Sequence, residues 1–513
     1  MVRSAPGIRM RSGVAAAAVA VGVSQLVAVA FGPRADVRSA VGSAVIDLTP
    51  GPVKEWAIQT FGMADKLFLS VMVLVVIAAI AAITALWETR RVPVGSATIV
   101  LAGVLGSVAV LSRPDATVAD TVPTVAGTIC GVVALRVLTG DRQTDTRSGD
   151  ETGAPGADPG RRLSLLALGL LGLGVLSGVA GAVLGRRLQS VSGDRDAFAI
   201  PIPASPLSPV PADVQAKGVE LPSFITSNED FYRIDTALAV PQLSRADWRL
   251  RIHGMVDREI TYRFEDLQQF EVVEKMVTLA CVSNPVGGDL ISNAVWTGYR
   301  VRDLLARSGI HDDADMVLST SVDGFSAGTP VKAMTDGRDS LLAVTMNGDP
   351  LPTEHGYPAR LVVPGLYGYV SATKWVIDLE LTRFDRAEAY WTRRGWSPRG
   401  PIKTQSRVDV PRNRQQVAPG PVTFGGVAWA QNRGVRRVDV RIDDGPWQAA
   451  ELGAGYSNQA WRLWSYPWQA VDPGLHSITV RATDNTGAIQ TSELADPLPD
   501  GATGWHTVSF AVR

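Results

Sequence analysis

The chain has 513 residues, with 49 Lys and Arg against 50 Asp and Glu, and a formal net charge of −1. This length predicts about three domains rather than one, and the balanced charge argues against a nucleic-acid partner. The two cysteines, Cys130 and Cys281, lie in different regions, so no disulfide framework is expected.

The first part of the chain is rich in Ala, Val, Leu and Gly, and it contains five apolar runs. A bilayer span needs roughly 20 apolar residues, so we expect about five membrane helices in a transmembrane region covering residues 1–190. The first run could be a signal peptide, but no clear cleavage site follows it, which favours a retained span. The runs cover residues 14–32, 67–86, 92–111, 118–138 and 163–185.

The distribution of basic residues favours a cytoplasmic N-terminus. Arg3, Arg9 and Arg11 precede the first run, and Arg90 and Arg91 lie in a loop that would face the same side. The loop after the first run is also basic, so charge alone discriminates weakly. Five spans from an inside start place the remaining domains on the extracytoplasmic side of the cell membrane.

The fifth apolar run begins with Gly160-Arg161-Arg162-Leu163-Ser164-Leu165-Leu166. This pattern resembles a twin-arginine export signal, which a receptor reads and which carries folded domains across the membrane. The alternative is an ordinary basic flank on a membrane helix. The export reading suits a domain that must fold around a cofactor before it is exported.

The first histidine of the chain is His253. A b-type haem in a membrane bundle is most often held by histidines on facing helices, so no haem is expected in this region. The helices are then an anchor or a docking surface, and electrons need a separate transfer partner.

Two segments have the composition of linkers. Residues 139–158 are rich in Asp, Thr, Gly and Arg and are typical of a flexible loop. Residues 191–222 are proline-rich, which predicts a semi-rigid spacer.

After the second linker, strand and helix patterns alternate, and an α+β domain is expected over residues 223–395. Strands are predicted at 248–252, 360–363 and 375–379, and a helix at 301–307. Over residues 396–513 the pattern changes to short alternating strands with turn signals, which indicates a β-sandwich. Four tryptophans would supply its large buried side chains: Trp429, Trp461, Trp464 and Trp468.

Cys281 is the most informative residue of the middle region. It ends the apolar strand pattern of residues 276–281 and opens the polar, glycine-bearing turn of residues 282–289. A lone cysteine is most often a small buried hydrophobe. A thiol at the end of a strand, facing small residues, is also placed to meet a soft metal or an electrophile.

The residues around Cys281 resemble the molybdopterin domain of the sulfite oxidase family over about residues 223 to 395. The resemblance is carried by the order of several short segments rather than by one motif. These are the Cys281 turn, Trp296-Thr297-Gly298, Arg302-Asp303-Leu304-Leu305, Ser321-Val322-Asp323-Gly324-Phe325, Asn347-Gly348, Glu354-His355-Gly356-Tyr357-Pro358-Ala359-Arg360, Val363-Pro364-Gly365 and Lys374-Trp375.

This resemblance implies a molybdenum–molybdopterin cofactor with Cys281 as the protein's thiolate ligand to the metal, a role that suits a soft donor. It also implies that Arg233, in Phe231-Tyr232-Arg233, lines the pocket for a substrate anion. The remaining cofactor contacts that it implies are Asp323, His355, Arg360, Ala372, Thr373 and Lys374.

The turn after Cys281 departs from the family in one respect. Sulfite oxidases usually have a basic residue a few positions after the cysteine, whereas this chain has Asn284-Pro285-Val286-Gly287-Gly288. Fewer cations weaken binding of a dianion, so a less charged oxygen donor or acceptor becomes plausible as substrate.

The C-terminal region resembles the family's immunoglobulin-like dimerisation domain, including Gly504-Trp505-His506-Thr507-Val508. This resemblance implies a possible homodimer. It also implies an arginine that approaches the active site, for which Arg433 is the nearest match. A turn-surface cation is an equally good interpretation of Arg433.

The expected protein therefore combines all-α membrane helices, an α+β sulfite-oxidase-like molybdopterin domain and an immunoglobulin-like β-sandwich. The expected function is two-electron oxygen-atom transfer on a small substrate, either reduction of an S-oxide or N-oxide or oxidation of a sulfur anion. One alternative is a non-enzymatic surface-binding module with a degenerate cofactor domain. Another is a hydrolase with Cys281 as nucleophile, which would need a histidine such as His355 within hydrogen-bond reach.

Overall fold

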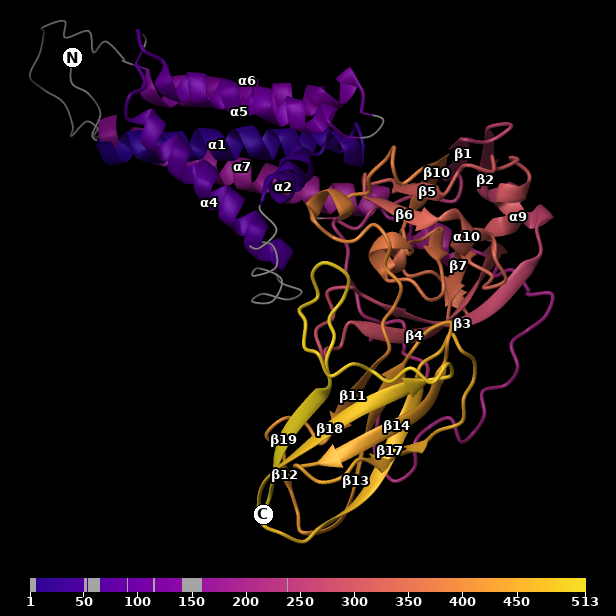
Figure 1. Ribbon diagram of the computed structural model, residues 1–513. Coiled ribbons are helices and arrows are strands. Elements are labelled where there is room, and N and C mark those ends of the chain that lie inside the picture. Colours follow the sequence, from indigo (N-terminus) through magenta and orange to yellow (C-terminus); the bar gives the residue numbers. More distant parts are fainter. Residues whose placement is uncertain are drawn as a thin grey trace, which may run out of the picture. The chain divides into compact units, whose positions relative to one another are not determined.

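The computed structural model describes residues 6–49, 53, 65–89, 91–113, 116–140, 159–237 and 239–513 (Figure 1). The chain divides into two compact units. The first comprises Met1–Ser190 and Thr236–Val240, and the second Val191–Asp235 and Pro241–Arg513. Arg3, Arg90 and residues 141–158 of the predicted loop lie outside the described residues.

The first unit is helical. Among the residues that the structure describes, five helices are long and apolar enough to cross a membrane, which confirms the prediction of five such segments. The first begins earlier than the apolar run suggested, because the basic residues Arg9 and Arg11 are already helical. The main helices are α1 (Pro6–Ala28), α2 (Val37–Leu48), α4 (Asp65–Ala85), α5 (Val94–Leu111), α6 (Val122–Thr139) and α7 (Pro159–Gln189).

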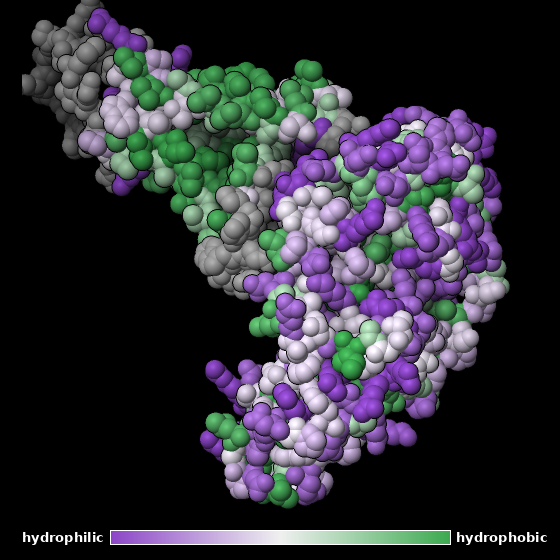
Figure 2. All heavy atoms as spheres, viewed as in Figure 1, coloured by the Kyte–Doolittle hydropathy of each residue, from purple (hydrophilic) through white to green (hydrophobic). Residues whose placement is uncertain are grey.

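Small residues allow these helices to approach closely, while large apolar side chains face outward. A Cβ on Gly22 of α1 would overlap the carbonyl of Gly174 in α7, so only glycine fits at this crossing. Leu101 and Leu105 of α5 are 59% and 60% exposed, and Figure 2 shows a mainly hydrophobic surface over these helices. Apolar residues outside and small residues inside are typical of a bundle surrounded by lipid.

The second unit contains two sheets in its middle region. One has the order β2-β1-β10-β5-β6, and the other β3-β4-β7-β8 with β9 also paired to β7. The predicted strands at 248–252, 360–363 and 375–379 correspond to β1, β9 and β10, and the predicted helix to α9 (Val301–Ala306). The strands are β1 (Arg249–Gly254), β2 (Ile260–Arg263), β3 (Val272–Ala280), β4 (Ile291–Arg300), β5 (Met316–Ser321), β6 (Ser326–Pro330), β7 (Leu341–Met346), β8 (Asp349–Pro350), β9 (Arg360–Val362) and β10 (Val376–Thr382).

The C-terminal region consists of two further sheets, in the orders β11-β13-β17-β16 and β12-β19-β18-β14-β15. Side chains from both sheets, including Phe424, Val440 and Phe510, form one core between them. The alternating residues seen in the sequence lie on three of these strands, β14, β18 and β19. The strands are β11 (Gln405–Val410), β12 (Gln416–Val417), β13 (Gly420–Trp429), β14 (Val435–Ile442), β15 (Gln448–Ala449), β16 (Glu451–Leu452), β17 (Arg462–Ala470), β18 (Gly474–Asp484) and β19 (His506–Val512).

The four C-terminal tryptophans do not all pack in the core between those two sheets. Trp464 lies in that core and Trp468 packs against it. Trp429 and Trp461 instead belong to the larger core that includes residues of the middle region. The Trp461 indole N–H donates to the carbonyl of Phe224 at 2.9 Å. The middle and C-terminal regions therefore share buried apolar surface.

The proline-rich segment is packed against the second unit rather than free. The Ala204 N–H donates to the Val272 carbonyl at 3.1 Å, and the Tyr456 hydroxyl donates to the Ser208 carbonyl at 2.8 Å. Val214 is 6% exposed. The composition favoured an extended spacer, but over these residues the extended backbone adds to the folded unit because its carbonyls and N–H groups find partners there.

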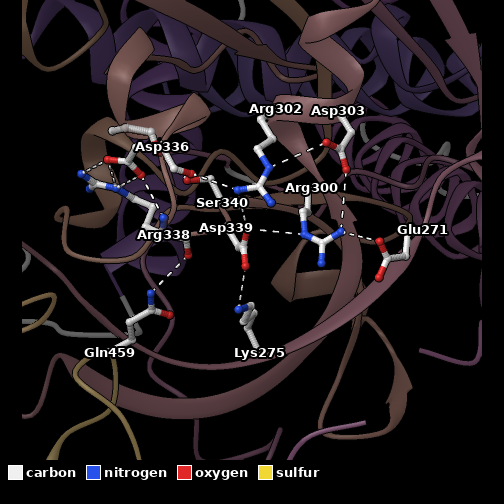
Figure 3. A network of polar contacts seen from close by, with 11 residues as sticks. Glu271, Lys275, Arg300, Arg302, Asp303, Asp336, Arg338, Asp339, Ser340 and Gln459 are labelled. Carbon is white, nitrogen blue, oxygen red and sulfur yellow. Dashed lines mark hydrogen bonds and ion pairs between the residues drawn. The ribbon is translucent and has the colours of Figure 1, made fainter. Parts of the chain in front are cut away.

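A network of charged residues ties together the loops at one end of the β3-β4-β7 sheet (Figure 3). Asp339 is its centre: its carboxylate lies 2.7 Å from Lys275 Nζ, 2.8 Å from Arg302 Nη1 and 3.4 Å from Arg300 Nε. Next to it, the Gln459 side chain of the C-terminal region donates to the Arg338 carbonyl at 3.2 Å. The network therefore connects β3, β4 and the loop before β7 with one another. Through Gln459 it also connects them to the C-terminal region.

Replacing Asp339 with asparagine is expected to lower the free energy of unfolding by about 2–4 kcal/mol, because three cations lose their shared carboxylate. Asparagine keeps the shape and tolerates the left-handed φ of 56° found at this position. Denaturant unfolding measures the change. Asp303→Asn is the control, since this 40% exposed carboxylate contributes less than about 1 kcal/mol; equal losses in both variants would contradict the assignment.

Candidate active site

Cys281 follows β3 directly and is half-buried. Its N–H donates to the Leu290 carbonyl at 2.9 Å, and the Leu290 N–H donates to Asn284 Oδ1 at 3.0 Å. These two bonds close the turn between β3 and β4. The thiol-bearing residue therefore stands at the end of an edge strand, on a short loop, as its sequence context predicted.

Arg233, Asp235 and Lys374 form a buried ion cluster. Asp235 Oδ2 accepts from Arg233 Nε and from Lys374 Nζ, both at 2.9 Å. Lys374 Nζ also donates to the Glu354 carbonyl at 3.1 Å. Burial, opposed by Asp235 and helped by the charges of Arg360 and Arg233, lowers the pKa of Lys374 to about 8.

Arg360 is 5% exposed and lies on the short strand β9. Its guanidinium donates to the carbonyls of His355 at 3.0 Å and Ala372 at 3.4 Å, and it lies over the Trp296 ring at 5.0 Å from the centroid. Burial lowers the pKa of Arg360 to about 10. Its hydrogen bonds with neutral carbonyls do not cancel its charge.

His355 is neutral in this cluster. Its Nε2–H donates to the Asn228 carbonyl at 3.2 Å, and burial, then the charges of Arg360 and Lys374, lower its pKa to about 3. Gly356 follows with φ of 114°, and a Cβ there would lie 3.2 Å from Lys374. This glycine lets the His355 turn pack directly against the lysine.

The buried phenol of Tyr232 feels the charges of both Cys281 and Arg360. Burial raises the pKa of its phenol; the charge of Cys281 raises it further and that of Arg360 lowers it. A Cβ on Gly368 would lie 3.8 Å both from the Tyr232 hydroxyl and from the carbonyl of Ala280, the residue before Cys281. The sequence showed this tyrosine only as part of the segment around Arg233. Its role was missed because no local pattern reveals which side chain faces the thiol.

The other predicted cofactor contacts lie close to Lys374. The hairpin that carries Asp323 is joined to Trp375, since the Val322 N–H donates to the Trp375 carbonyl at 3.1 Å. Thr373 Oγ1 and Ser319 Oγ form a hydrogen bond of 2.7 Å. The Ala372 N–H, expected to be a free donor, donates to the Gly368 carbonyl at 2.9 Å. The helical turn that begins at Gly368 therefore already uses the Ala372 N–H in a hydrogen bond.

Arg433 is engaged within the C-terminal region. Its Nε donates to Asp484 Oδ2 at 2.7 Å and its Nη2 to Thr404 Oγ1 at 2.9 Å. Burial raises the pKa of Tyr367 to about 12, and the charges of Cys281 and Arg433 are among the smaller influences on that phenol. The structure shows Arg433 as a paired cation of the C-terminal region.

The residues present suit an anionic cofactor that brings most of its own metal ligands. Arg233 and Lys374 both bond to Asp235, and the buried Arg360 lies near Lys374. The lowered pKa values of Arg360 and Lys374 show that their charge is costly there. Among the described residues, no group of three His, Cys, Asp or Glu side chains could hold a metal. A phosphate-bearing ligand would compensate the cations, and Cys281 would add one soft donor.

The protein is expected to lose stability in acid through its buried histidines. The pKa is lowered to about 3 for His355 and to about 4 for His506, in both cases mainly by burial. Below an unfolded value of about 6.5 the unfolded chain binds more protons, so the free energy of unfolding falls as the pH falls from 6.5 towards 4. Each histidine contributes up to about 1.4 kcal/mol per pH unit. Unfolding curves at pH 4 to 7 measure how steeply the free energy of unfolding depends on pH. The same pH dependence in the double variant His355→Gln/His506→Gln would contradict the role of these histidines.

Comparison with known proteins agrees with this arrangement. Residues 237–391 match the family model described as "Oxidoreductase molybdopterin binding domain". Sulfite oxidase of Homo sapiens is 32% identical over 290 residues, covering 47% of this chain and 52% of that protein. Sulfite oxidase of Gallus gallus is 30% identical over 321 residues, covering 53% of this chain and 69% of that protein. The chain thus spans about half the length of the human protein.

A solved structure shows the same fold. The sulfane dehydrogenase SoxCD of Paracoccus pantotrophus superposes with a TM-score of 0.50 at 23% identity, covering 61% of this chain and 91% of that chain. Because the sequence identity is low, this likeness concerns the fold alone. Taken with the relatives that are 30% or more identical, the chain belongs to the sulfite oxidase family of molybdopterin-dependent oxidoreductases.

Proposed function

We propose that the protein is a membrane-anchored enzyme that transfers an oxygen atom to or from a small substrate at molybdenum, with the Cys281 thiolate as a ligand to the metal. The observation that carries this proposal is the pair of buried cations, Arg360 and Lys374, which bond mainly to neutral carbonyls and to one carboxylate that Lys374 shares with Arg233. The charges of both Arg360 and Cys281 act on the buried phenol of Tyr232. When bound, the cofactor supplies a metal that exchanges one oxygen atom and two electrons with the substrate.

The chain's own residues would bind the cofactor and orient the substrate. Arg360, as a fork, and Lys374, as a point charge, suit the phosphate of the cofactor, and His355 would present a neutral ring beside them. Asp323, Ala372 and Thr373 are proposed contacts to the pterin. Arg233 would orient the substrate, but its guanidinium is shared with Asp235.

Two classes of substrate fit this proposal: a sulfur anion that is oxidised, and an S-oxide or N-oxide that is reduced. Relatives named sulfite oxidase favour oxidation of a sulfur anion. The turn after Cys281 has no basic residue, which favours a less charged S-oxide or N-oxide that would be reduced. A reduced-dye assay against sulfoxides, N-oxides and nitrate, with dye-linked sulfite oxidation in parallel, separates these outcomes.

The test of the proposal as a whole is elemental analysis of the purified, matured protein. About one molybdenum per chain is expected, since the family has a single such cofactor domain and one matching segment is present here. A fully matured preparation without molybdenum would overturn the proposal. The non-enzymatic alternative is set aside because the chain belongs to an enzyme family. The hydrolase alternative is disfavoured, because a histidine whose pKa is lowered to about 3 is a poor general base.

The five apolar helices suggest a multi-pass membrane anchor with the second unit outside the cytoplasm. Electrons would then pass to or from a separate partner protein. We also propose that the two C-terminal sheets form the immunoglobulin-like domain expected from the sequence, and that they support a homodimer. Light scattering in detergent tests the last point.

Replacing Arg161 and Arg162 by lysine is expected to leave the second unit inside the cell, because an export receptor distinguishes arginine pairs from equal charge. Protease accessibility on intact cells measures this. The matched control is Arg186→Lys/Arg187→Lys at the other end of the same helix, α7. If the Arg161 and Arg162 variant still exposed its second unit as the control does, the pair would be only a membrane flank.

A further inference from the structure

The loop that follows Cys281 is held from outside the middle region. Within the loop, the Gly288 N–H donates to the Pro285 carbonyl at 2.9 Å and the Asn284 N–H to the Cys281 carbonyl at 3.2 Å. These bonds shape the loop but do not fix its position. Two residues of the C-terminal region, Arg407 on β11 and His506 on β19, contact its far side.

The side chain of Arg407 binds the loop at a backbone carbonyl of the loop. Its Nη1 donates to the Gly288 carbonyl at 2.8 Å, while its Nε donates to Asp409 Oδ1 at 2.5 Å. The residue is 8% exposed. With its guanidinium oriented by Asp409, Arg407 makes a charge-assisted hydrogen bond in a buried setting, and such bonds are the strong ones.

His506 fills the space beside the next residue. Gly287 has φ of 78°, and a Cβ there would overlap the imidazole ring at Nε2 and Cδ2. The ring is itself held, because the Val408 N–H donates to His506 Nδ1 at 3.0 Å. Burial, and then the charge of Arg407, lower the pKa of His506 to about 4. The neutral ring therefore keeps Nδ1 as an acceptor.

The C-terminal region also holds the strand on the other side of the thiol. Thr278 lies three positions before Cys281, and all of its polar groups meet that region. Its N–H donates to the Gln459 carbonyl at 3.0 Å. Its hydroxyl oxygen accepts from the Trp461 N–H at 2.8 Å, and its carbonyl accepts from Gln431 Nε2 at 3.2 Å.

We propose that Arg407 and His506 are positioning residues of the active site: they set where the Cys281 loop stands, with Thr278 as the fixed point on the opposite side. The C-terminal region is then part of the construction of the site and not only an appended module. A ligand displaced by about 1 Å is enough to impair catalysis. The consequence for turnover rests on the proposed role of Cys281.

Hydrogen–deuterium exchange on the purified holoenzyme tests whether Arg407 and His506 stabilise the Cys281 loop, without assuming any role for the thiol. Arg407→Met keeps the apolar stem and removes the donor. Gly287→Ala drives a methyl group into the His506 ring. Both are expected to speed exchange in residues 282–290 by about tenfold or more, while peptides of β5 and β6 keep their rates.

Each variant has a matched control. Arg437 is bonded to Asp439 two residues on, as Arg407 is to Asp409, but contacts its own sheet, so Arg437→Met should leave the loop unchanged. Gly348 has φ of 82° with open space around it, so Gly348→Ala separates backbone strain from the clash. Adding His506→Ala to Gly287→Ala should bring the exchange rate of the loop below that of Gly287→Ala, because it vacates the clashing ring, but the rate should stay above that of the unchanged protein, because the ring that supports the loop is lost.

Turnover and molybdenum content complete the test. We expect Arg407→Met to lower kcat by about tenfold or more with molybdenum content unchanged, and with a changed thiolate-to-metal absorption band. Loop exchange as in the unchanged protein, faster exchange spread over the whole second unit, or a faster loop with normal turnover would each overturn the positioning role. A failure of molybdenum binding in the unchanged protein would instead count against the proposed function and leave the exchange result standing.

Discussion

Replacing Cys281 with serine is expected to abolish oxygen-atom transfer while the protein still folds. Serine is nearly isosteric, but its oxygen is a hard donor that stays protonated, so it is a poor substitute for a thiolate on a sulfur-bound metal. Loss of an outer contact to a metal ligand costs about 10–100-fold, and loss of the ligand itself should exceed this. The main-chain bond from Cys281 to Leu290 is retained, so stability should change little.

The measurement is turnover with a reduced or oxidised dye, with molybdenum content and thermal unfolding measured on the same sample. Cys130→Ser is the matched control, because this second cysteine lies on α6 in the first unit and should have no role in turnover. Activity of Cys281→Ser within about twofold of the control would remove the ligand assignment, since a lost ligand costs far more.

Replacing Arg360 with methionine is expected to have opposite effects on the cofactor and on the fold. Methionine keeps much of the stem that lies over Trp296 but removes the charge. A charge-assisted hydrogen bond contributes about 1.5–3 kcal/mol, so cofactor retention should fall by about 10–150-fold. The cofactor-free protein should become more stable, because burial already disfavours the charged form of Arg360.

Molybdenum per chain and thermal unfolding of the cofactor-free protein measure the two effects. Arg360→Lys provides the comparison: it keeps the charge but loses the planar fork, so it should bind the cofactor with intermediate strength. Full molybdenum content in Arg360→Met would show that this arginine does not bind the cofactor.

Much of the local structure could be predicted, whereas the list of site residues stays a prediction. Apolar runs of the length of a bilayer predicted the five helices because that length is a physical property of lipid. Alternation predicted strands β14, β18 and β19 because side chains alternate between the two faces of a strand. The proximity of His355, Arg360 and Lys374 could be expected from the resemblance, and the pKa shifts show their charges acting on one another.

The partners of those residues could not be predicted. Asp235 binds Lys374 across 139 positions of the chain, and Arg433 pairs with Asp484 rather than pointing into the site. No periodicity encodes which charges meet, because an ion pair forms wherever packing brings two side chains within reach. The proline-rich segment was misjudged for the same reason: composition describes a free chain, whereas the folded surface of the second unit supplies hydrogen bonds to it.

The amino-acid sequence by itself determined the apolar helices, the alternating strands and a thiol at a strand end, followed by the segments that resemble the molybdopterin domain of the family. These follow from short-range rules of length, period and chemistry. Only the tertiary structure decided that the charges of Cys281 and Arg360 both act on Tyr232 and that β11 and β19, more than a hundred residues further on, hold the Cys281 loop. Such contacts depend on how two folded regions share one core, and no single segment of sequence contains that information.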